Sequence, residues 1–143
     1  MSTRTARWGS RDRGSATAEF AIMVPALVLL ALLALLAHHL VAARMGSDTA
    51  AHAAARAATL ERTPAAAHTA AEAAVSETLH THGVACAEYD LDLDTGGLAP
   101  GATVTASVSC TADLSQLIGL GLPGTTTVEG DATSVVDTYR GTP

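Results

Sequence analysis

The hydrophobic pattern of the chain is dominated by one uninterrupted apolar run, from Phe20 to Ala37, which follows a short arginine-rich segment ending at Gly14. At about 1.5 Å per residue, a helix of this length spans roughly 27 Å, close to the hydrocarbon thickness of a bilayer. The pattern therefore predicts a transmembrane helix over about residues 20–40.

A helical pattern continues beyond the apolar run. Three- and four-residue spacing relates Ala42, Met45, Thr49, His52, Ala53, Arg56 and Leu60. Gly46 is a weak point, and Pro25 lies inside the membrane segment, where neighbouring groups compensate for the backbone hydrogen bond that proline removes. The spacing predicts one long helix over residues 15–62, half in the membrane and half outside it.

The next break in the pattern is Thr63-Pro64. Threonine is a favourable N-cap and proline suits the first helical position. A second, amphipathic helix is predicted from Pro64 to about Thr81, and Gly83 ends it. One face of this helix is lined by Ala67, Ala71, Ala74, Val75 and Leu79.

After Gly83, apolar and polar positions alternate with a period of two, which is the pattern of half-buried strands. The apolar positions of two successive segments are Tyr89, Leu91 and Leu93, then Val104, Ala106 and Val108. A glycine-rich loop over residues 95–101 joins them into an antiparallel hairpin. An apolar connector over 114–122 leads to a third strand over 125–138, which contains Gly130. The predicted fold class is α+β, with a small three-stranded antiparallel sheet in an extracytoplasmic domain over residues 63–143.

Composition limits the size of the core. The 143 residues leave room for one small domain beside a membrane helix, and the aromatic residues are one Trp, two Tyr and one Phe. Alanine is the most frequent apolar residue, so each core position buries little area. We therefore expect a modest hydrophobic core.

Charge is distributed unevenly around the apolar run. The chain has no lysine, and four of its eight arginines precede the run, namely Arg4, Arg7, Arg11 and Arg13. Two of the fourteen carboxylates, Asp12 and Glu19, precede it as well, so twelve follow it. The acidic remainder argues against nucleic-acid binding. The basic leader predicts an N-terminus inside the cell and a domain outside it, because arginines that flank a membrane segment are retained on the cytoplasmic side.

The two cysteines, Cys86 and Cys110, would then lie in a compartment that permits disulfides. A hairpin symmetric about Leu98 sets these cysteines opposite each other, but it also sets acidic residues of one strand against apolar residues of the other. One extra residue bulging near Ala87-Glu88 removes the conflict. We predict a Cys86–Cys110 disulfide with such a bulge, which in the loop-entropy model stabilises the fold by about 3 kcal/mol.

The segment from Gly14 through Ser15-Ala16-Thr17-Ala18 to Glu19-Phe20, followed by a long apolar helix, resembles the prepilin pattern of type IV pilins. The Glu-Phe pair, Pro25 and the length of the remaining chain resemble more specifically the TadE/TadG-like pseudopilins of Flp (tight adherence) pili. Flp major pilins are much shorter than this chain. Outside the segment 11–40, the resemblance rests on architecture.

The resemblance implies a processing site and an assembly role. A membrane-embedded prepilin peptidase would cut after Gly14, making Ser15 the new N-terminus and Glu19 the fifth mature residue. A charged carboxylate near the end of a membrane helix is costly, and pairing Glu19 with the terminal ammonium of a neighbouring subunit would reduce that cost. Glu19 and Phe20 are therefore the expected assembly residues. The implied partners are membrane lipid, other pilin or TadE/TadG-like subunits, the peptidase and the Tad secretion platform.

Other motifs point to no cofactor or metal. The run from Asp90 to Gly96 has acidic residues at alternate positions, but it lacks the glycine and glutamate that an EF-hand requires, so a solvated strand face is the better interpretation. His80 and His82 near Cys86 lack a second pair at zinc-ligand spacing, and the His38-His39 pair is expected at the outer membrane interface. No glycine-rich phosphate loop or nucleophile motif is present, so we expect no catalytic residues and no enzyme.

The leading hypothesis is a single-pass protein of the cytoplasmic membrane that assembles through its long helix, either within a pilus or as an accessory. An alternative is an uncleaved, membrane-anchored binding protein whose extracytoplasmic domain takes a ligand. A secreted protein with a cleaved signal peptide ranks lower, because the apolar run exceeds the usual length and Glu19 interrupts its start.

Overall fold

The structure is a computed structural model that describes residues 13–81, 86–113 and 124–141. The chain forms two compact units, Met1–Leu35 and Leu36–Pro143. The second unit, Leu36–Pro143, is called the head below. The predicted leader lies mostly in residues 1–12, outside the described residues.

Helix α1 extends over Arg13–Leu60 and contains Pro25 within its 48 residues. The prediction of one long helix is therefore confirmed, with the N-terminal boundary two residues earlier than Ser15. A gap of three residues separates α1 from helix α2, Pro64–Thr81.

The start of α2 follows the predicted capping chemistry. The amide of Ala66 donates to Oγ1 of Thr63 at 3.3 Å, and the amide of Ala67 donates to the Thr63 carbonyl oxygen at 2.9 Å. These bonds satisfy backbone donors that have no partner inside the first turn of a helix. Four of the five predicted apolar face residues of α2 are buried, and Ala74 is half-buried.

Three antiparallel strands form one sheet in the order β1-β2-β3. Their bounds are Glu88–Asp94 for β1, Thr103–Asp113 for β2 and Thr125–Val135 for β3, with a short 3-10 helix η1 over Gly96–Leu98. The fold class is α+β, as predicted. Strand β3 ends three residues before the predicted Thr138, because Asp137 accepts hydrogen bonds from the amides of Tyr139 and Arg140 and turns the chain. The predicted connector 114–122 and Gly83 lie outside the described residues.

The register of the β1–β2 hairpin differs from the prediction. Tyr89, not Cys86, pairs with Cys110, and Leu91 pairs with Val108. The hairpin is therefore not symmetric about Leu98, and pairing begins only at Glu88, so Cys86 lies outside the ladder. Burial excludes the symmetric register, because the observed pairing sets Leu91 and Leu93 beside the buried Val108 and Ala106, and a slip by an odd number of residues would reverse the faces.

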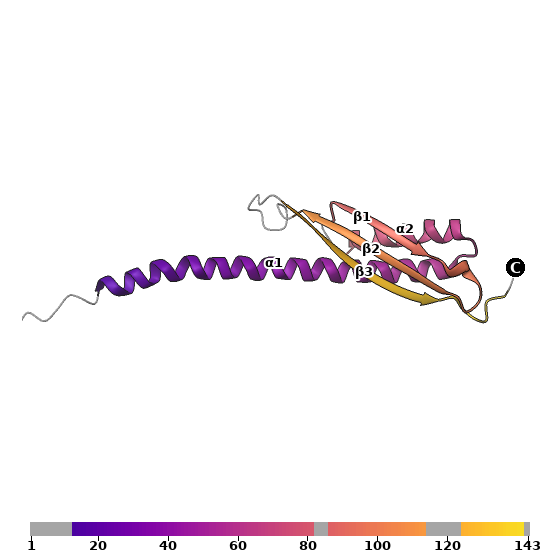
Figure 1. Ribbon diagram of the computed structural model, residues 1–143, viewed down its shortest axis with the longest axis horizontal. Helices are drawn as coiled ribbons and strands as arrows, with labels where there is room; N and C mark the ends of the chain where they lie inside the picture. The colour runs from indigo at the N-terminus through magenta and orange to yellow at the C-terminus, as the bar shows by residue number, and fades with distance from the viewer. Residues whose placement is uncertain (1–12, 82–85, 114–123, 142–143) are drawn as a thin grey trace, which may run out of the picture. The chain divides into compact units, whose positions relative to one another are not determined.

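Helices α2 and the head portion of α1 cover one face of the sheet (Figure 1). The core between them is built mainly from alanine and valine. On α1, the buried positions of the core cluster are Ala50, Ala51, Ala54, Ala55 and Ala58. The residues whose spacing predicted the continuing helix, such as Met45, His52 and Arg56, lie on the exposed side of α1 instead. Small side chains face the sheet because they allow the helix backbone to approach it closely.

Candidate assembly helix and acidic sheet face

The first half of α1 presents apolar side chains to its surroundings. All side chains over residues 21–31 are exposed, and they include Ile22, Leu27 and Leu30 at 75%, 65% and 65% exposure. The described helix from Glu19 to Leu60 is long and apolar enough to cross a membrane. An exposed apolar surface of this extent is unfavourable in water and favourable in a bilayer or against other apolar helices.

The predicted processing and assembly residues all lie on α1. Gly14 and Ser15 belong to its first turn, and Glu19 and Phe20 follow about one turn later. Glu19 is exposed and Phe20 is 68% exposed. A helical backbone thus carries the carboxylate directly before the apolar segment, which is the arrangement that the sequence predicted.

The His38-His39 pair lies in the head portion of α1, with ring centroids 5.9 Å apart in an edge-to-face arrangement. Among the residues that the structure describes, no group of three or more His, Cys, Asp or Glu side chains is placed to hold a metal ion.

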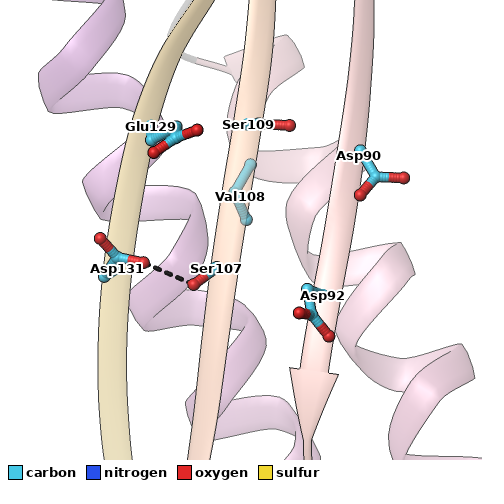
Figure 2. A pocket seen from close by; sticks show the side chains of 7 residues that line it. All are labelled: Asp90, Asp92, Ser107, Val108, Ser109, Glu129 and Asp131. Carbon is cyan, nitrogen blue, oxygen red and sulfur yellow. Dashed lines mark hydrogen bonds between the residues drawn. The ribbon is translucent and has the colours of Figure 1, made fainter.

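The outer face of the sheet is acidic. Figure 2 shows carboxylates and serines of three strands on the side away from the helices, around a shallow hollow of about 290 Å³. The residues that line it are Asp90, Asp92, Ser107, Val108, Ser109, Glu129 and Asp131. The sequence predicted the solvated acidic face of β1, and Asp90, Asp92 and Asp94 are indeed exposed.

Register explains how four carboxylates share this face. One row across the sheet consists of Asp90, Ser109 and Glu129. In each such row a serine of β2 separates two carboxylates, which places them two strand spacings, or about 10 Å, apart. At that distance salt screens much of the repulsion, whereas directly opposed like charges would destabilise the sheet.

The second row consists of Asp92, Ser107 and Asp131. Here the Ser107 hydroxyl donates a hydrogen bond to Oδ1 of Asp131 (Figure 2). Sequence reasoning did not associate Glu129 and Asp131 with the acidic face, because the β2–β3 register was unknown. Their alternation with Val128 and Gly130 was the available signal. The run from Asp90 to Gly96, which lacks the residues that an EF-hand requires, forms part of β1 and the turn that follows it. In this turn the Gly96 amide donates a hydrogen bond to Oδ1 of Asp94 at 3.0 Å.

The Cys86–Cys110 disulfide is present, as predicted, with the two Cα atoms 5.4 Å apart. Cys110 is fully buried in the central strand and Cys86 is partly buried against the core. At the position of the predicted bulge, the Ala87 amide donates to the Thr111 carbonyl oxygen at 2.8 Å, although Thr111 pairs with Glu88 in the ladder. Disulfides form and persist mainly in oxidising compartments.

These features define a class: a membrane-anchored protein with one long apolar helix and a small, disulfide-bonded α+β head. The family model of TadE-like proteins matches residues 14–56, which confirms the family resemblance over this segment. The match covers α1 from Gly14 to Arg56, and α2 and the sheet lie outside it. Comparison with curated proteins and with solved structures gives no match.

Proposed function

We propose that this protein is a structural minor pilin or pseudopilin that helps to assemble a Flp (Tad) pilus or a related secretion apparatus. The observation that carries the proposal is the match to TadE-like proteins, which begins at Gly14 and follows the apolar helix. Gly14 is also the residue that the prepilin pattern places before the cut. In this proposal the protein has no catalytic role, and its partners are pilin-like subunits, the peptidase and the secretion platform.

The proposed assembly surface is the first half of α1. After cleavage, the Ser15 ammonium and the Glu19 carboxylate are four residues apart on one helix. Two neighbouring helices offset along their axes can therefore pair one subunit's carboxylate with the other's ammonium. Burying this pair is much more favourable than burying either charge alone. The exposed apolar side chains over residues 21–31 then pack against lipid or against the neighbouring helix.

The leader and the disulfide support the proposed orientation. The leader arginines favour an N-terminus in the cytoplasm, which places the head outside the membrane. The Cys86–Cys110 bridge supports that placement, because disulfides persist in oxidising compartments and are rare in the cytosol.

Mass spectrometry of the membrane-extracted protein tests the processing step. In cells that contain a prepilin peptidase, the mature chain is expected to begin at Ser15. A Gly14→Leu variant should retain its leader, whereas a Gly9→Leu variant, which changes another leader glycine, should be cut normally. A mature start elsewhere overturns the processing step, and an intact leader on the wild-type protein favours the uncleaved, membrane-anchored binding protein.

The assembly step is tested with Glu19→Ala. This variant should be cleaved and inserted normally but should lose most of its co-purification with other pilin-like subunits after cross-linking in cells. Glu72→Ala, at an exposed position of α2, removes one carboxylate from the head and serves as the control. Normal co-purification of Glu19→Ala would contradict the pairing of Glu19 with a neighbouring terminus.

A further inference from the structure

The disulfide joins a residue just before the β1–β2 ladder to the central strand of the sheet. Cys86 precedes β1, and the β1–β2 pairing starts only at Glu88. Cys110 lies in β2, the central strand, and is fully buried. The bridge therefore fixes Cys86, two residues before β1, onto the central strand of the sheet.

The core that must otherwise hold the head together is small. Among the described residues, the largest fully buried side chains include Val75, Val104, Val108 and Val136, and the core leucines Leu79, Leu93 and Leu98 are 6–8% exposed. Among the described residues, eleven core positions are alanine, each of which buries a single methyl group: Ala43, Ala50, Ala51, Ala54, Ala55, Ala58, Ala67, Ala71, Ala106, Ala112 and Ala132. Small domains with limited cores commonly depend on a covalent or metal staple for stability.

Closing the 24-residue separation between the cysteines restricts the unfolded chain. In the loop-entropy model, loss of such a bridge lowers the folding equilibrium constant by a factor of roughly 200. Because natural domains are only marginally stable, a decrease of this size in the folding equilibrium constant removes a large share of the folding free energy.

We propose that the Cys86–Cys110 disulfide is a redox switch for folding: the sheet and α2 pack stably in the oxidised protein and open in the reduced protein. The head would then complete its folding only in an oxidising compartment. This behaviour belongs to the head alone and does not depend on cleavage after Gly14.

The switching reaction is thiol–disulfide exchange. The Cys86 thiolate attacks a disulfide of an oxidised thiol reagent or oxidoreductase and forms a mixed disulfide. The Cys110 thiolate then attacks Sγ of Cys86 and releases the second thiol of the oxidant. The two cysteines lose two electrons and two protons, and the oxidant leaves as two thiols. Cys86 is the accessible member of the folded pair because it is only partly buried.

Hydrogen exchange of the full-length protein in detergent micelles tests the switch. Complete reduction, verified by mass spectrometry after maleimide labelling, should raise the exchange rates of protected amides in β1, β2 and β3 by at least about thirtyfold. Reoxidation with oxidised glutathione should restore the slow rates. Amides over residues 24–35 of α1, which lie in the micelle, should not change and serve as an internal control.

A double variant, Cys86→Ala with Cys110→Ala, separates loss of the bridge from any other effect of the reductant. Its strand amides should exchange as in the reduced wild-type protein, and the reductant should not change them further. A rise below thirtyfold with both thiols free, or a double variant whose strands stay protected, would overturn the switch. Either result would leave the proposed processing at Gly14 and assembly through Glu19 intact.

Discussion

Gly130 of β3 lies directly against the backbone of Ser47 in α1. A Cβ atom built on Gly130 would overlap the Ser47 carbonyl group and the Asp48 amide nitrogen. Ser47 is fully buried at this point, and its Oγ has no hydrogen-bond partner among the described residues. The strand and helix backbones thus approach closely here because Gly130 has no side chain to hold them apart.

Replacement of Gly130 by alanine should destabilise the head by about 3 kcal/mol or more, because rigid backbone, not a flexible side chain, must move to admit the methyl group. Urea unfolding of the full chain, followed by circular dichroism, measures the change. Gly141→Ala is the matched control, since a Cβ there meets no atom within 4 Å. Equal stability of the two variants would show that β3 and α1 are not in such close contact.

The alanine face of α1 should not tolerate larger side chains. Ala54 is fully buried on the side of α1 that faces the core. Ala54→Leu should therefore lower the free energy of unfolding by about 1–3 kcal/mol through overpacking. His52→Leu, two residues away on the exposed side, should change the free energy of unfolding by less than about 0.5 kcal/mol. The same unfolding experiment compares them, and a tolerated leucine at position 54 would mean that the interface is loosely packed.

Leu98 combines burial with a left-handed backbone. Its φ is 57° and its side chain is 7% exposed, so the hairpin loop holds a leucine in a conformation that favours glycine. Leu98→Ala should cost about 2–4 kcal/mol through lost packing. Leu98→Gly should be at least as stable as Leu98→Ala, because glycine relieves the backbone strain. Thermal unfolding of both variants checks this order, and a less stable glycine variant would contradict the left-handed conformation.

The N-cap of α2 offers a local test. Thr63→Ala removes the Oγ1 acceptor of the Ala66 amide and should cost about 1 kcal/mol. Thr69 lies on the same helix, and its hydroxyl donates to the Ala65 carbonyl oxygen without satisfying a terminal amide. Thr69→Ala should therefore leave stability unchanged or raise it slightly, since alanine is the better helix former. Similar losses in both variants would argue against a specific cap at Thr63.

Much of the fold follows from local patterns in the chain. The three- and four-residue spacing predicted α1 and α2, and the period-two alternation around Leu91 and Val108 predicted strands. These predictions are confirmed because helices and half-buried strands impose those periods on any sequence. Thr63-Pro64 likewise marks the start of α2 through capping chemistry that acts within one turn.

The pairing between distant segments was harder to predict from the sequence. The disulfide is confirmed, yet Tyr89 and not Cys86 pairs with Cys110 in the ladder, because turn geometry and the burial of both strands jointly fix register. The acidic face shows the same limit. Asp90 and Asp92 were predicted to lie on one solvated strand face, but Glu129 and Asp131 join them only through the β2–β3 register.

The sequence by itself determined the apolar segment of α1, the prepilin-like pattern from Gly14 to Phe20, the α+β class and the cysteine pair, because each depends on residue type and short-range spacing. Tertiary structure alone decided which side of α1 faces the sheet, the register that gathers four carboxylates on one face, and the contact between Gly130 and Ser47. Those features depend on how closely backbones approach, and that distance is set by packing across the whole head, where small side chains permit contacts that no local pattern specifies.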